Sequence, residues 1–367
     1  MTSYGKNLNI QIYGGSHDGE IGLTVENLPR GIVIDYDSLL GFMQRRAPGQ
    51  NRFSTGRREP DRPVFLSGVD ENLVTNGERL HAVIRNENMR SGDYSNLTNI
   101  PRPSHADYPA IVKSEGKVDL RGGGHFSGRL TALFCIIGGI LKDELEKSGI
   151  RIGAHIESIH GVRDCRFHPT DVSADDFQAV LSHDFPVINL EAGELMKAQI
   201  DLAKAELDSV GGVIECAVIG LPAGIGEHIF SGMESRIAQA VFSIPAVKGV
   251  EFGAGFESAR LFGSENNDSY YVCGSEIKTK TNNAGGICGG MTTGMPLIFR
   301  GAVKPTPSIG KEQDSVDLST MENVKITVGG RHDPCIVQRA VPVFEAVAAI
   351  AVYDALLDCR SPEEMEK

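Results

Sequence analysis

Apolar residues recur at helical spacing in several stretches of the chain. Between residues 128 and 147 the large apolar side chains fall at intervals of three and four positions, beginning with Leu130 and ending with Leu145. Ser127 precedes this stretch as an N-cap residue and Gly149 follows it as the residue after the C-cap. The pattern therefore predicts a helix over residues 128–147.

Three further stretches have the same periodicity. Residues 194–207 and 233–242 each predict a helix, and the pair Gly211-Gly212 is expected to close the first of them. Residues 337–357 predict a longer and more apolar helix. It contains the charged residues Arg339, Glu345 and Asp354. These charges favour a buried amphipathic helix in a protein core over a membrane span.

Other segments have the pattern of β-strands. Residues 150–156 alternate between isoleucine or alanine and polar or small residues, and residues 8–13 and 213–221 are short apolar runs. The predicted helices and strands are interleaved irregularly, with no low-complexity linker and no repeat at a fixed period. We therefore expect an α+β fold in one catalytic domain over residues 1–358, followed by a polar tail over residues 359–367.

Composition narrows the function classes. A net charge of −12 argues against a nucleic-acid partner, and the 43 glycines indicate many tight turns and close approaches of backbone to ligand. The seven cysteines show no CxxC spacing, which argues against a thiolate metal site and fits a reducing cytoplasm. The N-terminus shows no secretory signal. We expect a cytoplasmic protein that contains no metal and does not associate with membranes.

Two segments near the N-terminus combine glycine or proline with groups that exchange protons or bind anions. Gly14-Gly15-Ser16-His17-Asp18 follows a predicted strand, where glycine permits a sharp turn and histidine can exchange protons near neutral pH. Taken alone, a turn with a solvated histidine explains it better. The second segment is rich in arginine: it contains Arg45, Arg46, Arg52, Arg57, Arg58 and Arg62, opposed by Glu59 and Asp61. It fits a small-anion site and a solvated charged loop equally well.

Glycine-rich turns lead into the predicted helix that starts near residue 128. Residues 121–129 read Arg-Gly-Gly-Gly-His-Phe-Ser-Gly-Arg, which fits a phosphate site at a helix N-terminus and also a plain capped connection. The spacing is not a GxGxxG fingerprint, because Ser127 stands where its last glycine would be, and no GxxxxGK[ST] motif occurs. The sequence therefore disfavours Rossmann and P-loop nucleotide sites.

Four more segments each have a structural explanation as well as a functional one. Residues 102–108, Arg-Pro-Ser-His-Ala-Asp-Tyr, hold His105, which Asp107 could simply bond in a loop. Residues 282–290 are dense in glycine, as beside a planar ligand or in a tight hairpin, and residues 304–308 form the stiff run Lys-Pro-Thr-Pro-Ser. Residues 330–335 contain Asp333, which could act as a helix N-cap.

Taken together and in this order, the segments resemble the chorismate synthase family over essentially the whole chain. Further matches are Arg57-Arg58-Glu59-Pro60-Asp61 and Val247-Lys248-Gly249-Val250-Glu251. The resemblance implies a β-α-β sandwich with helices between sheets, a homotetramer, and FMN as cofactor. It implies a trans-1,4-elimination on 5-enolpyruvylshikimate 3-phosphate, in which the 3-phosphate leaves and a proton departs from C6 to give chorismate. Reduced FMN is required without net redox change, lending electron density and accepting the C6 hydrogen at N5.

The resemblance also implies roles for single residues. His17 would donate a proton to the leaving phosphate, His105 would protonate or hydrogen-bond the reduced flavin near N1, and Asp333 would assist proton removal at N5. The residues expected to bind the substrate anions are Arg46, Arg52, Arg102, Arg129 and Arg331. The residues expected to bind FMN are His125, Phe126, Ser127, Pro245, Ala246, Gly289, Lys304, Pro305, Thr306, Pro307, Ser308 and Arg331.

The chain departs from the family pattern at several of these positions. The family usually has glutamate where Gly15 stands, glycine where Asp18 stands and arginine where Ala47 stands. It usually has Arg-Ser at residues 125–126 and asparagine where Pro245 stands. Ala47 and His125 each remove a permanent cation from the expected pocket, at about 1.5–3 kcal/mol for a charged hydrogen bond. Arg45 or Arg46 would have to compensate.

Two alternatives to an active lyase remain. The departures could have produced a non-catalytic relative that binds FMN or anions, or the chain could be a flavin oxidoreductase of another type. Retention of His17, His105 and Asp333 favours the active lyase. Some family members reduce their own flavin with NADPH. This chain shows no extra domain and no fingerprint for that cofactor, so we expect an external flavin reductase to supply reduced FMN.

Overall fold

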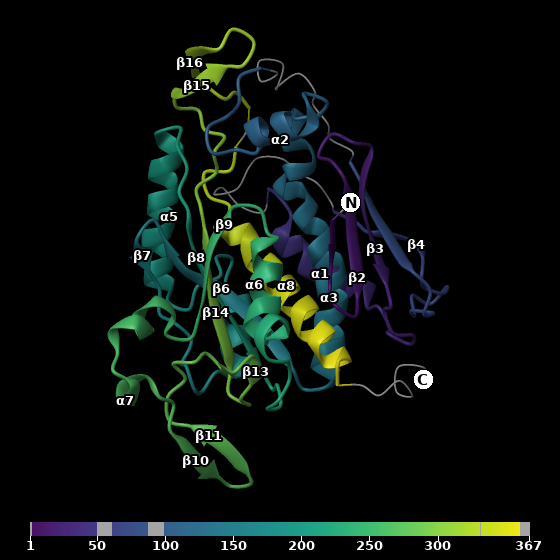
Figure 1. Ribbon diagram of the computed structural model, residues 1–367, viewed down its shortest axis with the longest axis vertical. Coiled ribbons are helices and arrows are strands. Elements are labelled where there is room, and N and C mark those ends of the chain that lie inside the picture. Colours follow the sequence, from purple (N-terminus) through teal and green to yellow (C-terminus); the bar gives the residue numbers. More distant parts are fainter. Residues whose placement is uncertain (1, 50–60, 87–98, 331, 360–367) are drawn as a thin grey trace.

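The computed structural model describes residues 2–49, 61–86, 99–330 and 332–359, and its architecture is a layer of helices between two antiparallel sheets (Figure 1). The first sheet has the strand order β1-β2-β3-β5-β4. Its strands are β1 (Thr2–Tyr4), β2 (Asn9–Gly14), β3 (Glu20–Glu26), β4 (Val64–Ser67) and β5 (Leu80–Arg85). The strands β3 and β5 pair buried apolar side chains on one face: Ile21 lies opposite Ile84, and Leu23 lies opposite Ala82. One face of this sheet therefore packs against the helices.

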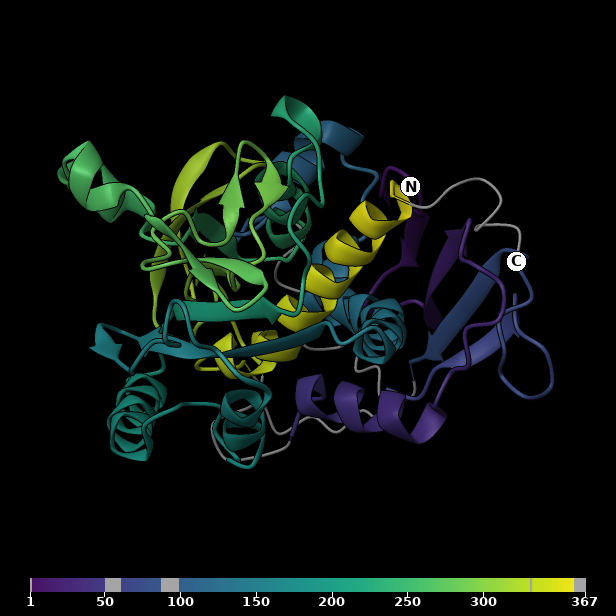
Figure 2. The ribbon, with the colours of Figure 1, turned by 90° about the horizontal axis from the view of Figure 1, so that it is seen from below.

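The second sheet has the strand order β7-β6-β8-β14-β9 and is also antiparallel. Its strands are β6 (Arg151–Ile159), β7 (Val162–Arg163), β8 (Gly212–Ile219), β9 (Val247–Phe252) and β14 (Leu297–Val303). All of β6 after Arg151 is buried, because helices α4 (Ala174–Leu181) and α5 (Leu190–Ala205) cover the outer face of this sheet (Figure 2). The strand predicted from the alternation in residues 150–156 is confirmed, and side chains on both of its faces are buried.

Four helices form the middle layer (Figures 1 and 2). They are α1 (Tyr36–Arg46), α3 (Thr131–Lys147), α6 (Met233–Phe242) and α8 (Val337–Leu357). Helix α8 is long and apolar enough to cross a membrane by length and composition, yet 94% of its most apolar window is buried inside the protein. It contacts α1, α3, α6, β6 and β8. The predicted core helix is confirmed, but it is buried along nearly its whole length and is not amphipathic, because three helices and the second sheet pack against it.

Short elements connect and flank these layers. The helical ones are α2 (Asp107–Ser114), α7 (Gly263–Asn266), η2 (Arg121–Phe126), η3 (Gly128–Leu130), η4 (Ile229–Ser231) and η5 (Gly255–Arg260). The strands form the hairpins β10 (Tyr270–Cys273) with β11 (Glu276–Thr279), β12 (Ile287–Cys288) with β13 (Met291–Thr292), and β15 (Gln313–Asp317) with β16 (Glu322–Ile326). In Figure 1, α7 and the β10–β11 hairpin stand clear of the layered body.

The predicted helices are present, with corrected ends. Those over residues 233–242 and 337–357 have the predicted bounds. The helix predicted from residue 128 begins as the 3-10 turn η3, where the Ser127 side chain accepts a hydrogen bond from the Arg129 amide, and becomes α3 at Thr131. Helix α5 begins at Leu190, before the predicted residue 194, because Asn189 caps it. It ends at Ala205, and Gly212 opens β8 instead of closing the helix.

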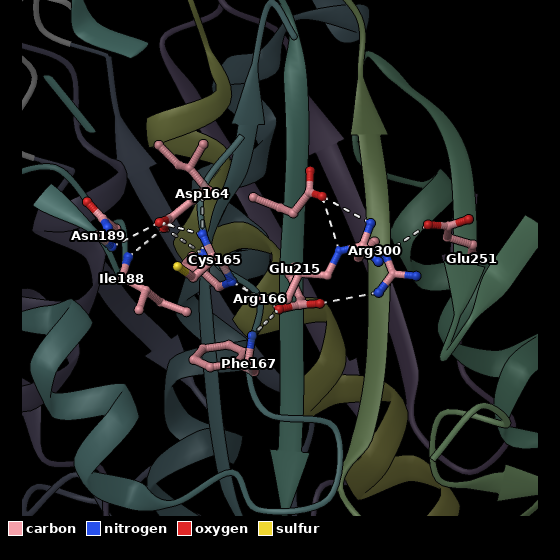
Figure 3. Close-up of polar contacts among 12 residues, drawn as sticks. Asp164, Cys165, Arg166, Phe167, Ile188, Asn189, Glu215, Glu251 and Arg300 are labelled. Atoms are coloured by element: carbon pink, nitrogen blue, oxygen red, sulfur yellow. Dashed lines mark hydrogen bonds and ion pairs between the residues drawn. The ribbon is translucent and has the colours of Figure 1, made fainter. Parts of the chain in front are cut away.

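A row of charged side chains lies on the outer face of the second sheet, buried except for the partly exposed Glu251 at its end (Figure 3). His155, Glu215, Arg300 and Glu251 occupy paired positions on β6, β8, β14 and β9. The Glu215 carboxylate contacts His155 Nε2 at 3.0 Å and Arg300 Nη1 at 3.2 Å, and Arg300 Nε donates to Glu251 at 2.8 Å. The row joins four strands of one sheet by opposite charges.

The Asp164 carboxylate extends this row into the covering layer. It lies 3.4 Å from His155 Nδ1 and accepts hydrogen bonds from the amides of Ile188 and Asn189 at 2.6 and 2.9 Å (Figure 3). These two residues precede α5, so the contacts tie the start of that helix to the sheet. Opposite charges and hydrogen bonds compensate the desolvation of this cluster.

Candidate active site

A cavity of about 600 Å³ lies where α6 ends and α3 and α8 begin. Five segments that are far apart in the sequence supply most of its wall. They lie within residues 102–106 except Pro103, 125–131 except Leu130, 243–246, 304–308 except Pro305, and 332–343 in part. Ser16, Arg46 and Pro48 complete the lining. The volume lies within the roughly 300–1,000 Å³ range of small-molecule and cofactor pockets.

Tight glycine turns bring the first strand segment to this wall. The Gly124 carbonyl accepts a hydrogen bond from the Ser16 amide at 3.1 Å, and His125 Nδ1 lies 2.8 Å from the Gly14 carbonyl oxygen. Gly124 has a φ of +52°, and a β-carbon there would lie 2.2 Å from the Asp119 carbonyl oxygen. Only glycine fits this turn, which holds Ser16 at the cavity.

His105 lies against a buried ion pair at one side of the cavity. Its Nδ1 is 2.6 Å from Asp107 Oδ1, and Arg102 donates to both oxygens of the same carboxylate, from Nε at 2.7 Å and from Nη2 at 2.8 Å. Burial alone would raise the pKa of Asp107, but the hydrogen bonds from Arg102 and His105 hold this pKa well below its usual range. Asp107 is therefore a carboxylate that only accepts hydrogen bonds.

Arg46 and Arg129 share the buried carboxylate of Asp61. Arg46 Nη1 donates to Asp61 Oδ2 at 2.7 Å, and its other donors reach the Thr131 hydroxyl and the Gly128 carbonyl. Arg129 forms an ion pair with Asp61 Oδ1. Asp61 is only 1% exposed. One negative charge therefore partly neutralises two arginines of the cavity wall and fixes their guanidinium groups.

Asp333 is paired with Arg339 at the start of α8. Arg339 Nη1 donates to Asp333 Oδ2 at 2.6 Å, and Arg339 Nε donates to the Arg46 carbonyl at 3.0 Å. Burial lowers the pKa of Arg339, and the charge of Asp333 opposes this effect. The possible N-cap role of Asp333 is wrong: α8 begins after Ile336, and no side chain of the described residues caps it.

The segment over residues 304–308 offers a cation and an unpaired hydroxyl. Lys304 Nζ donates to the Ser104 carbonyl at 2.9 Å, and burial together with the charge of Lys248 lowers the pKa of Lys304. The Lys304 amide donates to the Ala246 carbonyl at 2.9 Å, which joins two segments of the wall. Thr306 Oγ1 is buried and has no hydrogen-bond partner among the described residues. Such a hydroxyl is suited to a ligand with polar groups.

The structure brings most of the predicted site residues together. Those on the cavity wall are Arg46, Arg102, His105, His125, Phe126, Ser127, Arg129, Pro245, Ala246, Lys304, Thr306, Pro307, Ser308 and Asp333. The structure describes His17, Pro305 and Gly289, but these three predicted site residues do not line the cavity. The β12–β13 turn that carries Gly289 adjoins the N-terminus of α6, where Met233 donates to the Gly290 carbonyl, whereas the cavity lies beyond the C-terminus of α6. Arg52 and Arg331 lie outside the described residues.

His17 lies next to the wall. Its Nδ1 is 3.2 Å from the hydroxyl of Ser16, which lines the cavity. Sequence reasoning did not assign a role to Ser16, His332 or Arg339, which all line the cavity. Ser16 and His332 are adjacent in sequence to predicted site residues, and this adjacency was the available signal. Arg339 was interpreted as a charge in a core helix, and its partner Asp333 could be identified only from the fold.

Ala47, where an arginine was expected, is 1% exposed at the end of α1 and does not line the described part of the cavity. Arg45 does not replace the missing cation, because it forms a bidentate ion pair with Glu345 at 2.8 and 2.6 Å. Burial alone would lower the pKa of Arg45, but the Glu345 carboxylate raises it. Arg46 is therefore the arginine of this stretch that reaches the described cavity.

Comparison with known proteins identifies the family to which this arrangement belongs. The family model described as chorismate synthase matches residues 8–357. A chorismate synthase of Lancefieldella parvula is 43% identical over 97% of this chain and 96% of its own length, and one of Thermococcus gammatolerans is 44% identical over 96% and 97%. A crystal structure of chorismate synthase superimposes with a TM-score of 0.77 at 28% identity, covering 99% of this chain and 95% of that one. The chain belongs to the chorismate synthase family.

Proposed function

We propose that the protein forms chorismate from 5-enolpyruvylshikimate 3-phosphate by a trans-1,4-elimination that requires reduced FMN. The observation that carries the proposal is the convergence of five sequence segments on one cavity, because four of them overlap segments that resemble the family and the family model spans all five. His105, Asp333 and several cations lie within this single cavity. An elimination of phosphate from a substrate that carries a phosphate and two carboxylates needs proton transfer and cation contacts in one place.

The described residues fit a flavin mononucleotide. The cavity has room for a cofactor-sized ligand, and the buried hydroxyl of Thr306, which has no partner among the described residues, can bond to a bound molecule. Lys304 supplies a cation, and the Ser127 hydroxyl lies at the start of η3, near helix amides that suit a phosphate. When bound in reduced form, FMN supplies electron density that helps phosphate to leave and an acceptor for the C6 hydrogen.

The protein contributes placement and protons. His105 holds or donates a proton near flavin N1, and Asp333, oriented by Arg339, removes a proton at N5. Lys304 binds anionic groups, and Arg46, Arg102 and Arg129 do so partly through the carboxylates that hold them. His17 reaches the cavity through the Ser16 hydroxyl, so its proposed proton donation to the phosphate passes through Ser16. Arg52 and Arg331 remain proposed anion ligands, and Pro305 and Gly289 proposed flavin contacts.

The test is an anaerobic assay with purified protein, chemically reduced FMN and 5-enolpyruvylshikimate 3-phosphate. We expect phosphate and chorismate to appear in equal amounts, and both to be lost in a His17→Ala variant. Binding of reduced FMN without product would instead favour a non-catalytic relative. Hydride transfer to another acceptor would favour a flavin oxidoreductase of a different type.

We also propose that a separate flavin reductase is the partner that supplies reduced FMN. The chain contains no nucleotide-binding fingerprint. Under aerobic conditions with FMN and NADPH, we expect turnover only after a flavin reductase is added. Steady NADPH-driven turnover by the purified protein alone would contradict this.

A reducing cytoplasm is the proposed location. None of the seven cysteines forms a disulfide, and all seven lie in the described part of the chain. Free thiols in this number fit a compartment in which thiols are kept reduced. Mass spectrometry after rapid alkylation of whole cells should find the exposed Cys165, Cys273 and Cys288 modified as free thiols.

The proposed homotetramer is supported by an exposed apolar segment. Large apolar side chains are concentrated on η5, α7 and the β10–β11 hairpin, which project from the body (Figure 1). Phe256, Phe262 and Val272 are 80%, 77% and 73% exposed. Exposed apolar surface on a projecting two-stranded hairpin indicates a protein contact. Light scattering after size-exclusion chromatography should show a tetramer for the natural protein and smaller species for Phe262→Asp.

A further inference from the structure

We propose that Arg102 and Asp107 form a positioning device for His105, which fixes the imidazole with Nδ1 toward Asp107 and Nε2 toward the cavity. The inference deepens the proposed function and rests on it in one respect, the action of His105 on bound flavin. It assigns a role to Asp107, which cannot touch a ligand, and changes the role of Arg102 from an anion ligand to a support.

Asp107 is fully enclosed and its acceptors are all directed at this site. It is 0% exposed and does not line the described cavity. Besides the two guanidinium contacts, Asp107 Oδ2 accepts a hydrogen bond from the Arg102 amide at 3.0 Å. Asp107 is also the first residue of α2, so its backbone is part of a helix. The carboxylate is therefore fixed by both its own element and Arg102.

The contacts of Nδ1 select one tautomer of His105. At 2.6 Å from Asp107 Oδ1, Nδ1 must carry the proton, because a carboxylate oxygen and an unprotonated ring nitrogen would repel each other at this distance. Arg102 Nη2 also lies 3.1 Å from the same nitrogen, but this contact is 0.5 Å longer than the contact with Asp107, and a carboxylate is the stronger partner for Nδ1. Neutral His105 consequently presents Nε2 as a bare acceptor.

The ring orientation follows from the glycine loop beside it. A β-carbon built on Gly123 would lie 3.6 Å from His105 Nε2 and 3.6 Å from the β-carbon of Ser127, so Nε2 faces Gly123 beside the cavity residue Ser127. Gly123 has a φ of +89°, a conformation that side chains other than glycine rarely adopt. The loop thus leaves Nε2 unobstructed, while the opposite ring nitrogen is held by Asp107.

The contacts of Arg102 explain why it acts as a support. Arg102 is 4% exposed; its Nε and Nη2 bind Asp107, and its Nη1 donates to the Ser308 hydroxyl at 3.2 Å. The guanidinium group therefore connects the His105 segment to residues 304–308, the segment expected to bind flavin. A hydrogen-bonded carboxylate behind a histidine is a general way of setting which ring nitrogen acts.

The first test reads the tautomer directly in flavin-free protein. Nitrogen-15 NMR of protein labelled at histidine, with His105→Ala to assign the signal, should show His105 protonated at Nδ1 in its neutral form. In Asp107→Asn, part of the population should shift to protonation at Nε2. A natural protein whose neutral His105 carries its proton at Nε2 would overturn the proposal, whether or not the variant folds and whatever the activity.

The second test is a double-mutant cycle on turnover. Asp107→Asn should lower kcat by up to about 10²–10⁴-fold, the usual contribution of a positioned acid or base, with a smaller change in KM. In the His105→Ala background the same change should cost nothing further, because its effect passes through the ring. An equal loss in both backgrounds would contradict the positioning role.

A matched control separates positioning from loss of stability. Asp354→Asn also alters a buried aspartate that is paired with an arginine, since Arg236 Nη1 lies 2.9 Å from its carboxylate, but Asp354 does not line the described cavity. We expect this control to lower the melting temperature without changing kcat or the His105 signal. If the natural protein shows the Nδ1 tautomer but forms no chorismate, the proposed function fails while the positioning device stands.

Discussion

At the scale of single residues, buried carboxylates hold most of the arginines around the cavity. Arg45 pairs with Glu345, Arg46 with Asp61, Arg102 with Asp107 and Arg339 with Asp333. Glu345 has a pKa lowered to about 2, because Arg45 and Lys142 outweigh the effect of burial. The positive charge available to a substrate is therefore smaller than the arginine count suggests, and its geometry is more rigid.

The unpaired hydroxyl of Thr306 leads to a prediction with opposite effects on stability and binding. Thr306→Val keeps the side-chain shape and removes Oγ1, which is buried without a partner among the described residues. We expect the free energy of unfolding of flavin-free protein to stay the same or rise by up to about 1–3 kcal/mol. The dissociation constant for FMN should rise by roughly 2- to 13-fold, which corresponds to one lost hydrogen bond of about 0.5–1.5 kcal/mol.

Denaturant unfolding and titration followed by flavin fluorescence measure the two quantities. Thr306→Ser is the control, because it keeps the hydroxyl and loses only a methyl group. It should bind FMN more tightly than Thr306→Val does. A valine variant that is less stable but binds FMN normally would show that Oγ1 has a partner within the protein.

At the scale of secondary-structure elements, the contact between α3 and α8 depends on a glycine. A β-carbon on Gly138 would lie 2.4 Å from both the α-carbon and the β-carbon of Ala346. Small residues at this crossing allow the helix backbones to approach closely, in a layer with sheets on both sides. The packing requirement here opposes helix propensity, which favours alanine over glycine by about 1 kcal/mol.

Gly138→Ala should therefore destabilise the protein, by about 1–3 kcal/mol or more, since overpacking outweighs propensity. Gly41→Ala is the matched control within α1, where a β-carbon would meet no atom of the described residues within 4 Å. It should stabilise the protein by about 0.4–1 kcal/mol. Denaturant midpoints of the two variants should move in opposite directions, and movement in the same direction would refute the packing argument.

At the scale of the whole molecule, local pattern and long-range pairing differ in how far the sequence predicts them. Residues 233–242 and 337–357 were assigned correctly because apolar periodicity sets both ends of each helix. Helices α1, α2 and α4 were not predicted, being short or moderately apolar. The ion pair of Arg45 with Glu345 joins positions 300 apart, so no local pattern could reveal it. For the same reason Arg45 and Arg46 looked more available to anions than they are.

Gly289 shows the same limit for the site. Its motif placed it with the flavin residues, but the fold sets it at the opposite end of α6 from the described cavity. Family resemblance supplied the segments that meet, and the structure supplied their distances and partners. The β-α-β sandwich that the resemblance implied is confirmed, because the structure has a layer of helices between two sheets and superimposes on a chorismate synthase.

The buried charged row of the second sheet makes stability depend on pH in both directions. Burial alone would raise the pKa values of Asp164, Glu215 and Glu251, but hydrogen bonds from His155, Arg300 and backbone amides lower them. Burial alone would lower the pKa of His155, but Asp164 and Glu215 raise it. The carboxylates therefore contribute stability that is lost as pH falls through their folded pKa values, and His155 contributes stability that is lost as pH rises through its own.

Both contributions are fully present only between the unfolded pKa values of the two kinds of group, about 4.3 for glutamate and about 6.5 for histidine. The free energy of unfolding, measured by denaturant titration from pH 3 to pH 9, should therefore fall on both sides of this window. In His155→Gln, which keeps a hydrogen-bonding group near Glu215, the protein should be less stable inside the window, and the decline above pH 6.5 should be reduced. If stability declines above pH 6.5 by the same amount in the variant, other groups cause the decline. If His155 is held charged between Asp164 and Glu215, removing its side chain must reduce this decline.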